Sequence, residues 1–456
     1  MTPDLERFRR AMDEQLSEEL QHEGPSFTRR RVHGIVQFPG KATSVIGMRR
    51  AGKTTFLRQL RAERVARGIP PWRLPFLRLE EEQLLGLDAP TLGTLLDEYP
   101  KRYLTDPEGA PAAWFLDEIQ VVPGWERLVR RLLDSGSADI FLSGSSAALL
   151  SREIATELRG RGWTVLMHPF SFEEALRHGS SRAAPPATTN REALELEAAL
   201  RDWLVTGGFP EAQGLPTTAR MQLLRDYVDV AILRDVVERH GVRNVTGLRW
   251  LVRQLLANAG SLFSATKFHA RLKSREIAIG RDSVHDLVAH LEDCFLVRTV
   301  WMEADSERQR MINPRKAYPV DAGLIPAFDR TGRANIGHAL ETAVFVELER
   351  RGCEVTYVRT SGGYEVDFLA RAPGGDAELI QVCADASDPV TAEREIRALL
   401  DAAPRGAVAH RRLLTLTRAG LPPEAPPGIE ACPAYEWLLA DSDPEARLRP
   451  APPGWR

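Results

Sequence analysis

Residues 44–55 constrain this chain more than any other part of its sequence. They read G-x-x-x-x-G-K-T from Gly47 to Thr54, after β-favouring residues and before an apolar pattern of helical spacing. Glycines let successive backbone N–H groups turn toward an anion, and the following helix directs its positive end at the same point. A strand before the motif and a helix after it distinguish a phosphate-binding loop from a chance match. The sequence therefore predicts a nucleotide site.

Side chains of this loop have separate expected roles. Lys53 should reach the β- and γ-phosphates of ATP, and Thr54 should offer its hydroxyl to Mg²⁺. The predicted nucleotide-binding set consists of Gly47, Arg50, Ala51, Gly52, Lys53, Thr54 and Thr55.

An apolar run over residues 112–116 ends in two adjacent acids, Asp117 and Glu118. Parallel strands that are covered on both faces have such continuous apolar sequences, and ligands bind at their carboxyl ends. We therefore expect Asp117 to hold Mg²⁺ together with Thr54, and Glu118 to activate a water for attack on the γ-phosphate. The alternative is a strand that ends in a polar turn or in a helix N-cap at Asp117.

Residues 139–146 form another predicted strand-to-turn unit, which ends in small hydroxylated residues. Ser143 or Ser145 could hydrogen-bond the γ-phosphate or the attacking water, although a serine-rich cap of the next helix explains the same pattern. Arg161 follows shortly before another short strand. An arginine there could stabilise transition-state charge on a neighbouring subunit's nucleotide, and an ordinary surface arginine is the alternative.

Length and composition bound the class of protein. A chain of 456 residues suggests roughly three domains. The net charge of −3 gives no whole-chain basis for nucleic-acid binding, so any such surface must be a local patch. The charged N-terminus lacks a signal-peptide core, and no apolar run is long enough to span a membrane. We expect a cytoplasmic protein without a membrane partner.

Helical segments flank the predicted core. Residues 1 to about 23 have apolar residues at helical spacing, which predicts an amphipathic helix that packs on the ATPase body. The arginine run 29–31 is expected to be a solvated face, with a nucleic-acid contact as the alternative. Residues 191–246 are helical, and a lid over the nucleotide is the natural assignment after the core. The candidates for a nucleotide contact from this lid are Arg225, Arg234 and Arg239.

Residues 247–305 contain three short helical patterns followed by a predicted strand, which suggests a winged-helix-like domain. A recognition helix of this kind reads base edges in the major groove, and it would open with Arg281, Ser283 and His285. The flanking cations that could neutralise phosphates are Lys267, Arg271, Lys273 and Arg275. The same small domain also mediates protein contacts, so DNA and protein both remain candidate partners.

Residues 306–443 have an α/β layout that resembles the restriction-endonuclease-like fold. In that fold acids on neighbouring strands bind Mg²⁺ and a lysine orients the attacking water. Asp367 is present and Glu341 could assist it, but Gln381 stands in place of the second acid and Cys383 in place of the lysine. This exchange removes one negative ligand and the only cationic group. We therefore expect a nuclease-like scaffold without efficient nuclease chemistry.

The motifs in order carry a family resemblance. The series GMRRAGKTT, WFLDEI, FLSGSSAALL, LRGR and HPFSFEEAL resembles the AAA-type ATPases of bacteria and archaea that carry a C-terminal domain of largely unknown function. The later stretches GGFPE, NPRKAY, DAGL and EVDF match the same family in order, so the resemblance covers most of the chain. It implies an AAA-type core with Ser143 in the sensor position and Arg161 as the candidate arginine finger.

The predicted fold class is α/β: a P-loop AAA-type parallel sheet with a helical lid, then a winged-helix-like domain and a restriction-endonuclease-like α/β domain. The predicted boundaries are an N-terminal helix (1–30), the ATPase core (31–178), a linker (179–190), the lid (191–246), the winged-helix-like domain (247–305), the nuclease-like domain (306–443) and a tail (444–456).

We expect an ATPase that hydrolyses Mg·ATP and couples it to a conformational change of its later domains. DNA and further copies of the chain are candidate partners. Two alternatives remain: a metal-dependent nuclease, or a nucleotide-gated DNA- or protein-binding module with negligible turnover.

Overall fold

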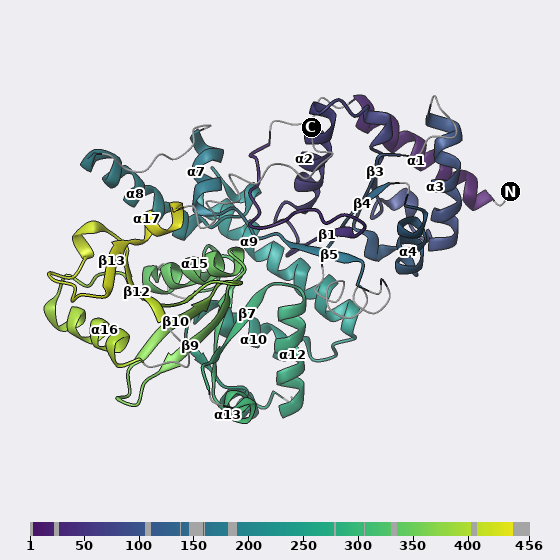
Figure 1. Cartoon of the computed structure of the whole chain (residues 1–456). Coiled ribbons are helices and arrows are strands. Elements are labelled where there is room, and N and C mark those ends of the chain that lie inside the picture. Colours follow the sequence, from purple (N-terminus) through teal and green to yellow (C-terminus); the bar gives the residue numbers. More distant parts are fainter. Residues whose placement is uncertain are drawn as a thin grey trace. The chain divides into compact units, whose positions relative to one another are not determined.

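The computed structural model describes residues 3–21, 27–104, 111–136, 138–145, 158, 160–180, 189–277, 280–304, 306–329, 335–402 and 408–440. The described chain separates into two compact units, the first up to Met167 and the second from His168 onward (Figure 1). No helix within these ranges is both long enough and apolar enough to cross a membrane.

The first unit is built on a five-stranded parallel sheet in the order β2–β3–β4–β1–β5. Strands β1 and β3 are buried along their whole length, as expected for a parallel sheet with both faces covered. Phe115 and Phe141 pack with α2 on one face, whereas Leu116 and Leu142 pack with α1, α3 and α4 on the other. The elements are α1 (Pro3–Gln21), β1 (Ala42–Ile46), α2 (Lys53–Ala66), β2 (Phe76–Arg78), α3 (Ala89–Tyr103), β3 (Ala113–Asp117), α4 (Trp125–Ser135), β4 (Asp139–Gly144) and β5 (Gly162–Leu166).

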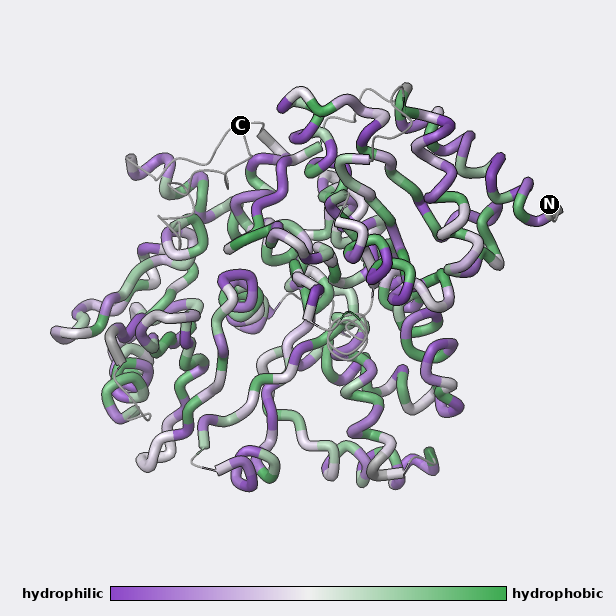
Figure 2. Tube along the Cα trace, turned by 45° about the vertical axis from the view of Figure 1, so that its right-hand side comes forward, coloured by the Kyte–Doolittle hydropathy of each residue, from purple (hydrophilic) through white to green (hydrophobic). Residues whose placement is uncertain are grey.

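The N-terminal helix α1 packs on this sheet through its apolar face. Phe8, Met12 and Leu16 are buried, and Figure 2 shows polar and apolar residues alternating along the helix. The Gln15 amide also bonds the edge strand β2, because its Oε1 accepts from the Arg78 N–H at 2.9 Å and its Nε2 donates to the Arg78 carbonyl at 3.1 Å. The helix therefore covers an edge that would otherwise expose unpaired backbone groups.

The second unit contains an eight-stranded mixed sheet in the order β13–β12–β11–β10–β9–β7–β8–β6. Its strands are β6 (Leu262–Phe263), β7 (Val297–Met302), β8 (Arg315–Pro319), β9 (Glu354–Arg359), β10 (Glu365–Arg371), β11 (Ala377–Cys383), β12 (Val408–Thr415) and β13 (Ile429–Pro433). Its helices are α7 (Phe172–Ser180), α8 (Asn190–Thr206), α9 (Thr217–Val230) with its π-helical continuation η5 (Ala231–Glu238), α10 (Val245–Ala257), α11 (Ala265–Lys273), α12 (Arg281–Asp293), α13 (Glu307–Ile312), α14 (Leu324–Phe328), α15 (Ile336–Arg350), α16 (Pro389–Asp401) and α17 (Ala434–Leu439).

The helices predicted as a lid belong to this second unit. Leu200 and Leu204 of α8 are fully buried in one apolar cluster with Tyr318 of β8 and Leu340 of α15. Most of the linker predicted between core and lid, residues 181–188, lies outside the described residues. The lid role itself stays a prediction.

Residues 245–319 follow the order helix, strand, helix, helix, strand, helix, strand, with the short helix α13 between β7 and β8. Strand β8 pairs antiparallel with both β6 and β7, which makes a small three-stranded sheet. Strand β7 also pairs parallel with β9, where Trp301 lies opposite Thr356. The small sheet therefore continues into the C-terminal strands.

The C-terminal strands β9, β10 and β11 form an antiparallel meander, and β11, β12 and β13 run parallel to one another. Phe368 of β10 packs in the cluster that contains α15, whereas Leu369 packs in the cluster that contains α16, so helices cover both faces. The register between β10 and β9 shifts between Val366 and Leu369, which places Asp367 in a bulge. Bulges commonly redirect a side chain.

Two glycine-containing motifs meet around one buried carboxylate. Asp321 accepts hydrogen bonds from the backbone N–H groups of Gly208 at 2.6 Å and Gly323 at 2.9 Å. A Cβ atom at Gly207 would overlap the Asp321 carboxylate, and one at Gly208 would overlap the Phe170 carbonyl. The motifs GGFPE and DAGL therefore join the end of α8 to the segment after β8, and glycine is required because the backbones approach so closely.

Candidate nucleotide-binding site

The predicted phosphate loop connects β1 to α2 through a tightly turned backbone. Gly47 has φ +145°, and a Cβ atom there would overlap the carbonyl oxygen of Met167. Arg50 and Gly52 also have positive φ angles, of 66° and 98°. No side chain caps α2, which begins at Lys53, so no cap side chain occupies its first backbone N–H groups. This is the local structure that binds anions at helix N-termini.

Lys53 and the two acids of β3 converge at the carboxyl edge of the sheet. Lys53 Nζ donates to the carbonyl oxygens of Gly47 and Met48, both at 3.2 Å, and lies 3.7 Å from Glu118 Oε1. Thr54 Oγ1 donates to Asp117 Oδ2 at 2.8 Å. The structure thus brings together the residues predicted from two motifs more than 60 positions apart.

Ser143 lies between the two motifs because β4 is inserted between β1 and β3 in the sheet. Its register partner on β1 is Val45, just before the loop. Ser143 Oγ donates to Asp117 Oδ1 and accepts the backbone N–H of Glu118 at 2.9 Å. Ser143 therefore holds both acids in place.

The carboxylate of Asp117 is almost fully buried. Burial raises the pKa of Asp117 to about 6, against the hydrogen bond from Ser143. The neighbouring Glu118 raises this pKa further, whereas Thr54 and Lys53 lower it. A cation bound here would favour the charged form and reverse the shift.

Arg30 is a loop-supporting residue that the sequence did not single out. It is only 3% exposed, its guanidinium donates to the Ala51 carbonyl at 2.7 Å, and its backbone N–H donates to Gln59 Oε1. Arg29 beside it is largely exposed and pairs with Glu63. The expectation of a solvated arginine run is therefore wrong for Arg30, and no pattern in the sequence distinguishes it from its neighbours.

Other predicted site residues differ in their placement. Ala51 is buried, Thr55 is half-buried and Arg50 is exposed in the loop. Ser145 is buried directly after β4, and residues 146–157, which include the predicted helix after these serines, lie outside the described residues.

Arg161 does not join the loop of its own chain. It precedes β5, whose first residue Gly162 pairs with Ala42 at the amino end of β1, whereas the loop follows the carboxyl end of β1 at Ile46. The two ends lie about 13 Å apart at the rise of a strand. Arg161 is 44% exposed and pairs with Asp134.

The acids predicted in the C-terminal domain meet a cation that sequence reasoning missed. Lys316 of β8 is 3% exposed, and its ammonium lies 2.8 Å from Asp367, 3.0 Å from Glu341 and 3.0 Å from Glu365. Burial opposes the charge of Lys316, but Asp367 and the other acids outweigh it and raise the pKa of Lys316 well above its ordinary value. The inference that Cys383 removed the only cationic group is therefore wrong.

Gln381 and Cys383 take up structural positions around this cluster. Gln381 Oε1 accepts the Asp367 N–H at 3.2 Å, and its Nε2 donates to Glu395 at 2.7 Å. Cys383 Sγ lies 3.2 Å from the Asp385 carbonyl. In the sequence Lys316 is a single lysine in the stretch RKAYP, and nothing there indicates that its side chain is buried among acids.

Comparisons with known proteins identify an AAA domain in the part of the chain that holds the predicted nucleotide site. Residues 39–176 match the family model of the AAA domain, and residues 197–335 match a domain of unknown function (DUF8612). An uncharacterized protein of Haemophilus influenzae is 30% identical over 330 residues, which cover 72% of this chain and 78% of that protein.

Two solved structures resemble the chain at low TM-scores. The Walker-type ATPase of Pyrococcus abyssi has a TM-score of 0.36 and 16% identity, with 70% of this chain and 95% of that chain covered. The Aeropyrum pernix ORC1 protein in complex with DNA has a TM-score of 0.26 and 16% identity, with 72% and 92% covered.

An uncharacterized protein of Methanocaldococcus jannaschii, named MJ1544, is 33% identical over 369 residues. The match covers 80% of this chain and 79% of that protein, and it extends well beyond the AAA domain. The chain therefore belongs to the family of AAA-domain proteins that includes this M. jannaschii protein.

Proposed function

We propose that the first unit binds Mg·ATP and hydrolyses it. The observation that carries this proposal is the meeting of Lys53, Thr54, Asp117 and Glu118 at one edge of a parallel sheet, next to an uncapped helix N-terminus. Phosphoryl transfer requires positioning and charge stabilisation more than covalent chemistry, and these groups supply both.

The residues present fit a magnesium ion. Thr54 and Asp117 offer a hydroxyl and a carboxylate already 2.8 Å apart, and hard oxygen donors are the ligands that Mg²⁺ prefers. When bound, the ion would neutralise charge on the phosphate oxygens. Lys53 would exchange its bonds to two loop carbonyls for phosphate oxygens. Glu118, held by Gln120 and Lys53, would orient a water and accept its proton.

Steady-state hydrolysis and nucleotide binding test the proposal together. Glu118→Gln should slow hydrolysis roughly 10²–10⁴-fold, because it removes the proton acceptor, while fluorescent-ATP binding persists. The Lys53→Ala variant should lose both hydrolysis and ATP binding. Glu82→Gln, the same charge change at an exposed position of the first unit, should alter neither. Equal turnover by the Glu118 variant would reject its role.

A nucleotide-gated binding module with negligible turnover is the second candidate, and the same assay separates the two. Hydrolysis by the natural chain no faster than that of the Lys53→Ala variant, with ATP binding retained, would favour the switch. We further propose that nucleotide state changes the conformation of the second unit, which nucleotide-dependent protection of His168–Pro444 from proteolysis would test.

Arg161 enters the proposal as a residue that acts on a neighbouring copy. Its exposure and its place at the amino edge of the sheet support a contact with another subunit's nucleotide rather than its own. Arg161→Ala should lower turnover and should be rescued by mixing with Lys53→Ala subunits, because each then supplies what the other lacks. If the mixture does not recover activity, Arg161 does not act on the nucleotide of a neighbouring copy.

A winged-helix-like contact with duplex DNA remains part of the proposal. The order of elements from α10 to β8 supports it, and Ser283 and His285 are exposed at the start of α12. The side chain of Arg281 lies outside the described residues.

A restriction-endonuclease-like scaffold is supported by the β9–β10–β11 meander and the parallel β11–α16–β12 connection. Nuclease chemistry is the weaker candidate, because the neutral amide of Gln381, which bonds the Asp367 N–H and Glu395, stands in place of the second acid. Mg²⁺-dependent DNA cleavage that Asp367→Ala abolishes would reverse this judgement.

A further inference from the structure

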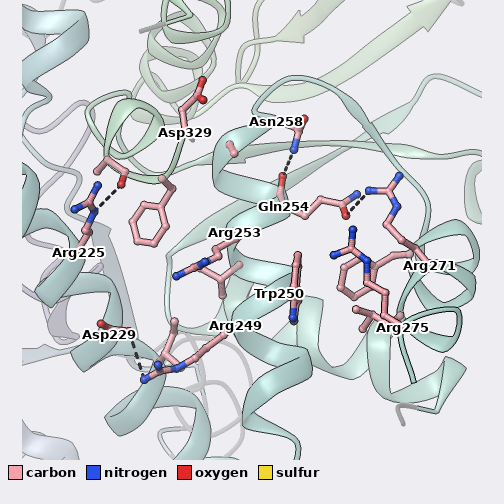
Figure 3. A pocket seen from close by; sticks show the side chains of 17 residues that line it. Arg225, Asp229, Arg249, Trp250, Arg253, Gln254, Asn258, Arg271, Arg275 and Asp329 are labelled. Atoms are coloured by element: carbon pink, nitrogen blue, oxygen red, sulfur yellow. Dashed lines mark hydrogen bonds and ion pairs between the residues drawn. The ribbon is translucent and has the colours of Figure 1, made fainter. Parts of the chain in front are cut away.

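An arginine-rich groove lies within the second unit, between α9, α10, α11 and α14 (Figure 3). It has a volume of about 800 Å³. Helix α10 forms its floor and contributes Trp250, while α14 closes one side. The arginines that line the groove are Arg225, Arg249, Arg253, Arg271 and Arg275.

The groove has an excess of positive charge. Its five arginines face two carboxylates, Asp229 and Asp329. The ion pair between Arg249 and Asp229 is 3.8 Å long and more than half exposed on both sides, so water screens it strongly. Arginines gathered around one cavity repel one another, and an anion placed among them would relieve that repulsion.

Two of these guanidinium groups, those of Arg225 and Arg271, are held in position by neutral partners. Arg225 Nε donates to the Ala327 carbonyl at 2.8 Å, and Arg271 donates to Gln254 Oε1 at 3.1 Å. These bonds orient the groups without cancelling their charge. Arg253 is exposed, has no hydrogen bond or ion pair within the described chain, and extends into the groove in Figure 3. The groove thus offers oriented planar donors, which suit phosphate oxygens.

Trp250 adds an aromatic surface to these charges. The Arg275 guanidinium stacks over its ring, 4.6 Å from the centroid. Figure 3 shows Trp250 edge-on, with Arg275 on one side and Arg253 across the groove on the other. One face of the indole is therefore covered by a cation, and the indole is part of the lining of the groove.

A planar base with attached phosphates satisfies both features at once. Proteins that bind single strands combine a basic groove with aromatic side chains on which bases stack. A base inside a duplex is paired and stacked between its neighbours, so it cannot enter a concave site without being turned out. The volume also lies in the range of sites that enclose a small group rather than a helix.

We propose that this groove binds single-stranded nucleic acid, with an unpaired base against Trp250 and its flanking phosphates among the arginines. The residues that line the groove include neither those of the nucleotide loop nor Ser283 and His285 of α12. It also reassigns Arg271 and Arg275, which sequence reasoning had placed beside a duplex.

Fluorescence anisotropy of the full chain with a labelled oligothymidylate of about a dozen nucleotides tests the proposal. Trp250→Leu should weaken binding of this single strand roughly 5- to 100-fold, the usual loss for one stacked base, and should leave binding of a duplex of equal length unchanged. Arg253→Gln, at an exposed side chain without a hydrogen bond or ion pair to any described residue, should reduce the salt dependence of log K by roughly 0.7 for one lost phosphate contact.

Matched variants outside the groove should bind as the natural chain does. Trp72→Leu makes the same aromatic change at a 43% exposed position of the first unit, and Arg191→Gln makes the same charge change on α8. An equal loss of duplex and oligothymidylate binding in the Trp250 variant, or unchanged oligothymidylate binding by both groove variants, would overturn the proposal.

Discussion

Replacement of Lys316 by methionine tests how much the buried charge cluster stabilises the second unit. Methionine keeps the length and apolar stem of lysine but removes the ammonium that contacts Asp367, Glu341 and Glu365. Removal of one partner from a buried ion pair typically costs about 3–5 kcal/mol, because the remaining charge is left uncompensated. We expect a loss in this range at pH 8, since Asp367 and Glu341 are both largely buried.

The loss should depend on pH in a defined direction. Without Lys316, burial keeps the folded-state pKa of Glu341 above its unfolded value, so the folded variant binds a proton more tightly than the unfolded chain. The free energy of unfolding should therefore rise as the pH falls from 8 toward the unfolded carboxyl values near 4. Glu341 already shows this tendency, because burial raises its pKa in the natural chain.

Hydrogen exchange followed by mass spectrometry can measure the effect locally, in peptides that cover β8 and β10. Lys273→Met, the same change at an exposed position of α11, is the control and should shift these free energies by less than about 0.5 kcal/mol. Neutralising the three acids in the Lys316→Met background should restore most of the stability. A loss below about 1 kcal/mol, or one that does not change with pH, would refute the reasoning.

Three further substitutions test other close contacts. Gly47→Ala should abolish ATP binding in a calorimeter, because the new methyl group would overlap the Met167 carbonyl, whereas Gly136→Ala, at φ +60° with nothing within 4 Å, should preserve binding at a cost of about 1–2 kcal/mol. Asp321→Ala should destabilise the second unit by about 2–6 kcal/mol in hydrogen exchange, because two buried N–H groups lose their acceptor. Asp376→Ala, at an exposed position after a turn, is the control. Equal losses of stability in the Asp321 and Asp376 variants would show that the bonds from Gly208 and Gly323 to Asp321 do not stabilise the second unit. Ser143→Ala should slow hydrolysis by roughly 10- to 100-fold through the lost bonds to Asp117 and Glu118, while Ser44→Ala, which removes a buried hydroxyl without a partner in the described chain, should not. Equal rates for the two serine variants would show that Ser143 does not position the acids.

The nucleotide loop and the acids Asp117 and Glu118 were predictable because each belongs to a short sequence motif with a known chemical role. A parallel strand that ends in Asp117 and Glu118 brings both to the same sheet edge as Lys53, whatever the intervening chain does. Only the general rule that parallel strands share their carboxyl edge is needed. Ser143 was a candidate for the same reason, since it ends a strand of the same sheet.

Arg30 and Lys316 were not predictable, because their importance comes from partners far away in the chain. Nothing near Arg30 indicates that its guanidinium bonds the Ala51 carbonyl. Lys316 looks like a strand residue until the fold places Glu341, Glu365 and Asp367 around it. Charges of either sign are usually exposed, so a single residue gives no sign that it is buried and paired.

The later family motifs have two different structural roles. GGFPE and DAGL act as a joint, since Gly207, Gly208 and Gly323 let separate segments approach until their backbones bond one carboxylate. NPRKAY and EVDF act as a charge cluster, since Lys316 of one bonds Asp367 of the other. Neither arrangement by itself needs a substrate to explain its residues. The arginines around Trp250 differ in this respect, because five guanidinium groups line the groove with two carboxylates, and a bound anion would offset this excess of positive charge.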